Sequence, residues 1–294
     1  MSEVIAYGIE FNRALEGYRT PLLTIMFKIF TFLGSTKGYF LVIPVIYWIF
    51  SRSLGLRLLY GIMLCNLVNT ILKELIQLPR PFLLGNLNPL DQPQSYSFPS
   101  GHAQIAAFFA VFLIVKYRTK TILGLGLAFA LLTGFSRAYL GAHFFFDVLA
   151  GWALGIVLAL YYSRYDEALL RYTPSFLITF GFLLFFCAVP IFFTDFLTLS
   201  TAGGLAGTLI ASRLDRQRLA EQLNLLRSWR KRTLLCLCGF SIFFLMFYSA
   251  RLNIENKPIV FLHNLLMAFW IVYAVPKLGT LCFARHEEVS APPK

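Results

Sequence analysis

Charged side chains are scarce in this sequence. Of its 294 residues, 14% are Asp, Glu, Lys or Arg, whereas 58% are hydrophobic and 31 are phenylalanine. Soluble globular domains usually carry about a quarter charged residues. So few charges do not cover a core this apolar, and the composition therefore excludes an ordinary soluble domain. It indicates an all-α fold, a polytopic bundle of transmembrane helices.

Cysteine pairs and glycosylation signals are also missing. The five cysteines lie in or beside apolar runs, and none forms a Cys-x-x-Cys pair or a spacing typical of a metal site. We interpret them as small buried apolar residues. No Asn-x-Ser/Thr sequence occurs. Residues 1–20 are mixed in polarity and lack the apolar core of a signal peptide, so internal helices are expected to direct insertion.

Apolar segments recur along the chain, and a transmembrane helix needs about 20 apolar residues. The first segment is interrupted by GSTKG at 34–38, so we expect its opening piece to lie along the interface and 38–51 to cross. The segment at 196–211 is short and is either a span or a re-entrant segment. The complete set is 21–50, 55–72, 103–115, 121–136, 143–162, 174–193, 196–211, 233–250 and 258–275.

The basic residues orient these segments. With nine crossings, 17 of the 26 Lys and Arg residues fall on one side. Basic loops stay cytoplasmic, so we expect the N-terminus outside and the C-terminus in the cytoplasm. The basic run at 212–232 supports counting 196–211 as a span, because its seven basic residues otherwise lie on the wrong side. Topology and anionic headgroups then explain the net charge of +12, and nucleic-acid binding is not expected.

Three polar stretches interrupt the apolar sequence on the side expected to face away from the cytoplasm. The first is KELIQLPRPF, in which Lys73 and Arg80 are seven residues apart, two helical turns, and so share a face. Asn66 and Asn69 lie on the same stripe, which indicates a polar seam toward the bundle interior. The prolines on either side of Arg80 end this helix. Alternatively, Lys73 pairs with the adjacent glutamate or snorkels to the interface.

The second stretch is PSGHAQ at 99–104. Gly101 permits a close approach of the backbone to a ligand, and Ser100 can cap the helix that begins near His102. Free N–H groups at a helix start attract anions. The alternative is an ordinary turn with a surface histidine.

The third stretch is SRAYLGAHFFFDV, in which Arg137 ends one helix and His143 begins the next. Asp147 follows four residues later, on the same face. Its carboxylate can accept the imidazole Nδ1–H and leave the Nε2 lone pair free as a nucleophile. Alternatively, the pair staples one helical turn.

The three stretches together supply three cations, two histidines, one carboxylate and a helix N-terminus on one side of the membrane. Three cations around a helix start suit a phosphoryl group with two or three negative charges. Two histidines suit a nucleophile and an acid. Structural features that arose independently would scatter over both faces, so the combination predicts phosphoryl chemistry.

This set resembles the type-2 phosphatidic acid phosphatase superfamily, which also includes glucose-6-phosphatase, sphingosine-1-phosphate phosphatase and vanadium haloperoxidases. The family pattern is Lys-x6-Arg-Pro, Pro-Ser-Gly-His and Ser-Arg-x5-His-x3-Asp, and every position is matched between residues 73 and 147. The resemblance implies a phosphate-binding set made of Lys73, Arg80, Ser100, Gly101 and Arg137.

The resemblance also implies the catalytic roles. His143 attacks phosphorus, Asp147 orients His143, and His102 protonates the leaving alkoxide. Water activated by His102 then hydrolyses the phosphohistidine. No metal and no cofactor are expected, because the three cations neutralise the phosphate charge.

These inferences predict an integral-membrane phosphatase that hydrolyses a phosphate monoester on the non-cytoplasmic face. A phosphorylated lipid is favoured as substrate because the loop at 82–98 is short and holds no obvious sugar-binding cluster. The alternatives are a sugar-phosphate phosphatase of the glucose-6-phosphatase type, a phosphate-lipid transporter or flippase, and vanadate-dependent halide oxidation.

The chain is expected to comprise a catalytic helix bundle at 1–171 and additional transmembrane helices at 172–294. The additional helices shape a lipid-entry groove or a homodimer contact, and membrane lipids are the remaining partners. The expected location is a bacterial inner membrane with a periplasmic active site, or the endoplasmic reticulum with a luminal one in a eukaryote.

Overall fold

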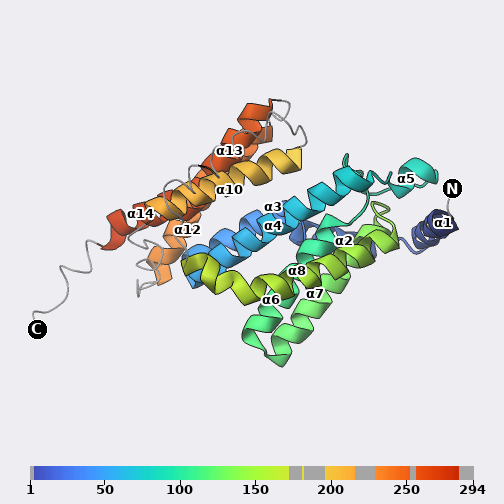
Figure 1. Ribbon diagram of the computed structural model, residues 1–294, viewed down its shortest axis with the longest axis horizontal. Helices are drawn as coiled ribbons and strands as arrows, with labels where there is room; N and C mark the ends of the chain where they lie inside the picture. Colours follow the sequence, from blue (N-terminus) through green and yellow to red (C-terminus); the bar gives the residue numbers. More distant parts are fainter. Residues whose placement is uncertain (1–2, 172–180, 182–195, 216–228, 252–255, 285–294) are drawn as a thin grey trace, which may run out of the picture. The chain divides into compact units, whose positions relative to one another are not determined.

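The chain folds into helices and connecting loops, with no strand among the residues that the structure describes. Contacts divide it into two compact units, one of Met1–Phe40 and Leu64–Glu167, the other of Leu41–Met63 and Ala168–Lys294. The predicted span at 174–193 lies outside the described residues. The computed structural model describes residues 3–171, 181, 196–215, 229–251 and 256–284 (Figure 1).

The first unit holds all three polar stretches. An N-terminal helix that the sequence did not predict, α1, precedes a bent pair, α2 and α3, whose axes meet at 61°. The bend falls at Gly34 and Ser35, inside the GSTKG interruption, as predicted. The helices of this unit, three of which continue into the other unit, are α1 (Glu3–Gly17), α2 (Pro21–Leu33), α3 (Thr36–Val45), α4 (Arg52–Ile76), α5 (Pro81–Leu84), α6 (Gly101–Tyr117), α7 (Lys120–Tyr139) and α8 (Phe145–Arg171).

The described residues contain four helices that are long and apolar enough to cross a membrane, or five if the bent pair α2–α3 counts as one span. Helix α6 is apolar but shorter, with 17 residues. The count of nine spans and the orientation of the chain therefore stay predictions. The four candidate spans are Arg52–Leu84, Lys120–Tyr139, Phe145–Glu167 and Pro258–Cys282.

Helices α6 and α8 approach each other so closely that their backbones touch. A Cβ atom added to Gly151 would lie 2.5 Å from the Ser100 carbonyl oxygen, and one added to Gly155 would lie 2.2 Å from the Gln104 carbonyl oxygen. No side chain fits at either position. The start of α6, which carries the PSGH sequence, is therefore fixed directly on α8.

The second unit contains a helix pair, α10 (Phe196–Leu214) and α13 (Lys257–Phe269), which run side by side (Figure 1). Residues 196–211 lie within one continuous helix. Helix α12 (Trp229–Arg251) and a helical run from α13 through η2 (Trp270–Ala274), α14 (Val275–Gly279) and η3 (Thr280–Ala284) complete this unit. The Trp48 indole N–H, on η1 (Ile46–Phe50), donates to the Ile271 carbonyl oxygen at 2.8 Å.

Candidate active site

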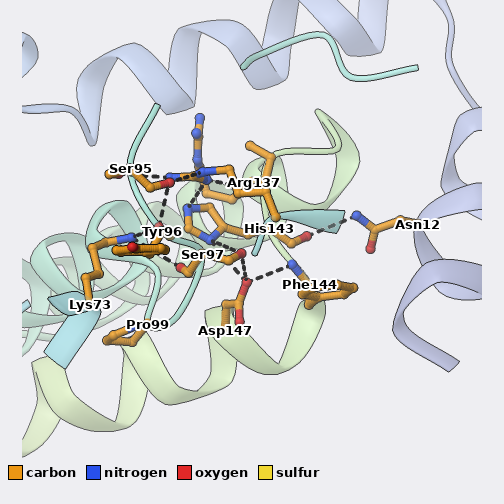
Figure 2. Close-up of polar contacts among 12 residues, drawn as sticks. Asn12, Lys73, Ser95, Tyr96, Ser97, Pro99, Arg137, His143, Phe144 and Asp147 are labelled. Atoms are coloured by element: carbon orange, nitrogen blue, oxygen red, sulfur yellow. Dashed lines mark hydrogen bonds and ion pairs between the residues drawn. The ribbon is translucent and has the colours of Figure 1, made fainter. Parts of the chain in front are cut away.

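His143 lies at the centre of a buried polar cluster (Figure 2). It occupies the loop between α7 and α8, two residues before α8 begins, whereas the sequence suggested that it starts that helix. Asp147 sits in the first turn of α8, and its Oδ2 lies 3.2 Å from the His143 Nδ1. The same oxygen accepts the Phe144 backbone N–H at 2.9 Å. The predicted histidine–carboxylate contact therefore forms, but across a loop–helix junction rather than along one helix.

Arg80 determines which nitrogen of this imidazole carries the proton. Its Nη1 lies 3.2 Å from the His143 Nε2. A guanidinium only donates hydrogen bonds, so Nε2 accepts and the proton of the neutral ring resides on Nδ1, facing Asp147. This is the tautomer that leaves a lone pair on Nε2. Burial lowers the pKa of His143 well below its ordinary value, and the positive charge of Arg80 adds to this effect, so the ring is neutral.

Lys73 and Arg80 both point into the cluster, but they do not share a helix. Helix α4 ends at Ile76, and Gln77 adopts a left-handed backbone with φ of 50°. Arg80 therefore reaches the site from the turn before α5, and the prediction of a shared helical face is wrong. The prolines beside Arg80 exclude an α-helix through it, because proline lacks an N–H and clashes with the preceding turn.

The buried face of α4 is nevertheless polar, as predicted. Asn66, Asn69 and Lys73 are all at least 93% buried. The Lys73 ammonium donates to the carbonyl oxygens of Tyr96 and Ser97, in the loop that precedes α6. The alternative in which Lys73 pairs with Glu74 or reaches the interface does not apply.

Carbonyl groups also hold the Arg80 guanidinium. Its Nε donates to the Ser95 carbonyl oxygen at 2.6 Å, and its Nη1 donates to that of Ala142 at 2.6 Å. Its Nη2 donates to the Ser95 hydroxyl at 3.1 Å and to the Tyr96 carbonyl oxygen at 3.2 Å. Two buried cations thus face neutral carbonyl dipoles, and this site retains an unbalanced positive charge that attracts an anion.

Ser97 belongs to the cluster although the sequence did not single it out. Its hydroxyl donates to Asp147 Oδ2 at 2.5 Å and lies 3.5 Å from the His143 Nδ1 (Figure 2). The residue is fully buried. It precedes the PSGH sequence by only two residues, and this closeness to the motif is the signal that could have marked it.

Helix α6 begins at Gly101, with Ser100 in the N-cap position and His102 one residue inside. Ser100 makes no side-chain cap, so the predicted capping hydrogen bond is absent, and its buried hydroxyl has no hydrogen-bond partner among the described residues. Gly101 is tightly packed: an added Cβ would lie 3.0 Å from Asn69 Oδ1. The free hydroxyl and the N–H groups at the helix N-terminus can both donate hydrogen bonds to a phosphate oxygen.

Arg137 ends α7 as predicted and is fully buried. Its Nη2 lies 2.7 Å from Asp91 Oδ2, and its Nη1 donates to the Thr31 hydroxyl at 3.3 Å. Its backbone carbonyl oxygen accepts the N–H groups of Ala142 and His143, at 3.0 and 3.2 Å. The side chain and the backbone of Arg137 therefore both belong to the site.

Helix α1 contacts the loop that contains His143. The Asn12 side-chain amide donates to the His143 carbonyl oxygen at 3.0 Å (Figure 2), and Ile9 packs with Leu87 and Phe144. Asn12 is 131 residues from His143 in sequence. No motif or periodicity connects residues so far apart, and the sequence therefore gave no signal for this contact.

Comparison with known proteins places these residues in a family. A family model described as the PAP2 superfamily matches residues 54–171. In a crystal structure of a transmembrane PAP2 type phosphatidylglycerolphosphate phosphatase from Bacillus subtilis, 88% of that chain aligns with 57% of this one, at 30% identity and a TM-score of 0.49. This chain belongs to the PAP2 superfamily.

Curated relatives match this PAP2 protein over part of its length. Phosphatidylglycerophosphatase B of Bacillus subtilis is 37% identical over 116 residues, which are 36% of this chain and 55% of the relative. Undecaprenyl-diphosphatase of Sulfolobus acidocaldarius is 36% identical over 107 residues, 36% of this chain and 52% of the relative. The chain thus spans about half the length of the curated relatives it matches.

Proposed function

We propose that this protein is an integral-membrane lipid phosphate phosphatase that transfers the phosphoryl group to His143 and then to water. The observation that supports this most directly is the state of the His143 ring. Asp147 holds the Nδ1–H at 3.2 Å, and Nε2 carries the lone pair that a nucleophile needs. Catalytic roles carry over from the family pattern to His143, His102 and Asp147.

In the first step, Nε2 of His143 forms a bond to phosphorus while the bond from phosphorus to the ester oxygen breaks. His102 gives its proton to that leaving oxygen, so the alcohol departs neutral. Positive charge develops on the imidazole, and the Asp147 carboxylate stabilises it. Arg80 loses its contact with Nε2 and donates instead to a phosphoryl oxygen.

In the second step, water attacks phosphorus and gives a proton to His102, and the bond from phosphorus to Nε2 breaks. Inorganic phosphate leaves and the neutral His143 is restored. We propose that Lys73, Arg80 and Arg137 balance the charge of the phosphoryl group through both steps, with the Ser100 hydroxyl and the Gly101 backbone N–H on its oxygens.

A phosphorylated lipid is the proposed substrate class. The relatives named for phosphatidylglycerophosphate and undecaprenyl diphosphate act, by their names, on lipids with a terminal phosphate. The described helices that flank the site are apolar, and Arg52–Leu84 and Phe145–Glu167 are candidate spans. The headgroup of an amphiphile can thus enter the polar cluster while its tail stays among the lipids.

We infer nine spans with the N-terminus outside, which puts the site on the non-cytoplasmic face. The 17 basic residues assigned to the cytoplasmic side support this orientation. In a bacterium the site then faces the periplasm, and in a eukaryote the lumen of the endoplasmic reticulum. A catalytic part at 1–171 and additional helices at 172–294 that contact lipid or a second copy remain our proposal for the domain organisation.

Rapid acid quenching with a ³²P-labelled lipid phosphate tests the mechanism. We expect label on wild-type protein and none on His143→Ala, with phosphate released in EDTA and without any ion gradient. His102→Ala should slow both steps by a factor on the order of 10² to 10⁴. Label trapped on His143→Ala, or a strict requirement for Mg²⁺, would contradict the proposal.

A further inference from the structure

Asp91 lies in the loop between α5 and α6, outside the family pattern, yet it pairs with a proposed phosphate-binding arginine. Its Oδ2 is 2.7 Å from the Arg137 Nη2. It is the only acidic residue between Gly85 and Ser100. A carboxylate on this arginine occupies a donor that a substrate oxygen would use.

The two partners differ strongly in burial. The Arg137 side chain is fully buried, whereas the Asp91 side chain is 40% exposed. A buried guanidinium without an anion is costly, but an exposed carboxylate is readily hydrated. The Asp91 side chain can therefore turn into solvent at low cost, provided that another anion takes its place on Arg137.

The ion pair with Asp91 also leaves some hydrogen-bond donors of the Arg137 guanidinium without a partner among the described residues. One carboxylate oxygen contacts one nitrogen, Nη1 binds the Thr31 hydroxyl at 3.3 Å, and the buried Nε has no partner among the described residues. A guanidinium has five N–H donors and suits bidentate binding of phosphate. A phosphoryl group thus offers Arg137 more hydrogen bonds than Asp91 does.

The loop backbone does not need to move for this exchange. The N–H of Leu90 donates to the Leu140 carbonyl oxygen at 2.9 Å, which anchors the loop next to Asp91. Asp147, the other carboxylate of the site, accepts three hydrogen bonds and is fully buried. Of these two carboxylates, only Asp91 can be displaced without disrupting the histidine.

We propose that Asp91 is an internal counter-anion that holds Arg137 in the empty site, gives way to the substrate phosphoryl group, and returns as inorganic phosphate leaves. This inference rests on the proposed function, because it assigns the anion that replaces Asp91. Competition between the two anions weakens phosphate binding and speeds product release.

The test uses inorganic phosphate as the probe, measured as a competitive inhibitor of lipid phosphate hydrolysis by the full-length protein. Asp91→Asn keeps the shape and removes the charge, and we expect it to bind phosphate about fivefold more tightly, the upper end for an ion pair with one exposed partner. Asp91→Ala removes the same charge and gives the same comparison should Asp91→Asn not fold.

Glu16→Gln is the matched control. Glu16 also neighbours this loop, where it accepts the Asn88 backbone N–H at 2.7 Å, but its ion pair is with Arg19. Its removal takes away one negative charge without touching Arg137. We expect phosphate affinity to change less than about twofold, because the Glu16 carboxylate is paired with Arg19 rather than with Arg137.

Thermal unfolding gives a second readout. Without phosphate, Asp91→Asn should unfold at a lower temperature than wild type, since Arg137 is then buried without an anion. Saturating phosphate should remove this difference.

If Asp91 instead stays on Arg137 and only orients it, both neutral variants should bind phosphate as tightly as wild type or more weakly, and phosphate should not restore their stability. That result overturns the inference about Asp91 alone. If wild-type protein neither binds inorganic phosphate nor releases it from a lipid phosphate, the proposed function is overturned as well.

Discussion

Replacing Ser97 with alanine removes the shortest hydrogen bond to the Asp147 carboxylate. Three donors share Asp147 Oδ2: the Ser97 hydroxyl at 2.5 Å, the Phe144 N–H at 2.9 Å and the His143 Nδ1–H at 3.2 Å. Without the hydroxyl, two donors remain and the carboxylate is free to rotate about its χ2 angle. The imidazole then loses the fixed acceptor that orients it.

The size of the effect follows from the kind of hydrogen bond. A hydrogen bond to a charged group contributes about 1.5–3 kcal/mol, and it is fully buried here. In the proposed mechanism the imidazole becomes positively charged only as Nε2 bonds to phosphorus, so the orientation of Asp147 should matter most in the transition state. We therefore expect Ser97→Ala to lower kcat by about ten- to a hundredfold, with KM within about twofold of wild type.

The assay is phosphate release from a short-chain phosphatidate in detergent micelles. Ser163→Ala is the control. The Ser163 hydroxyl donates to the Leu160 carbonyl oxygen within helix α8, and this hydrogen bond is exposed. This variant should retain wild-type kinetics. A kcat for Ser97→Ala equal to or above that of wild type, or a raised KM with unchanged kcat, would refute the reasoning, since Ser97 would then act elsewhere than on Asp147.

Three further predictions address the pKa, the packing and the topology. Burial and the positive charge of Arg80 lower the pKa of His143 in the folded protein. As pH drops below about 6.5, the unfolded chain therefore binds a proton at His143 before the folded protein does, and the stability of the fold decreases. The melting temperature should fall more for wild type than for His143→Gln between about pH 7.5 and about pH 5.5. Gly101→Ala should reduce phosphate release by pushing against α4, whereas Gly124→Ala, which meets nothing within 4 Å, should not. In a background without the native cysteines, Asn88→Cys should react with an impermeant thiol reagent in intact cells and Gln222→Cys should not; the reverse pattern would place the site in the cytoplasm.

The sequence predicted the helices and the residues of the cluster because both leave local signals. Apolar runs marked α4, α7 and α8, and the GSTKG interruption marked the bend between α2 and α3. The family pattern marked Lys73, Arg80 and His143, which the structure brings into one cluster. Spacing alone could not show how these side chains reach it.

The errors arose where local periodicity was extended past a break. The spacing of Lys73 and Arg80 matches two helical turns, but α4 ends before Arg80 and the chain turns at Gln77. The contacts of Asn12 and Asp91 could not be predicted at all. They join residues 131 and 46 positions apart, and such contacts depend on tertiary packing that leaves no repeat in the sequence.

The glycine contacts between α6 and α8 have a consequence for how this fold can be adapted to another substrate. Ser100 and Gln104 present carbonyl oxygens to Gly151 and Gly155 with no side chain between the two backbones. The distance from His102, on α6, to the residues at the start of α8 is therefore set by main-chain contact, and it tolerates no larger residue at those glycines. The Asp91 side chain, in the loop before α6, is 40% exposed, so a change of side chain at that position can adapt the site to a different headgroup while the reacting atoms keep their spacing.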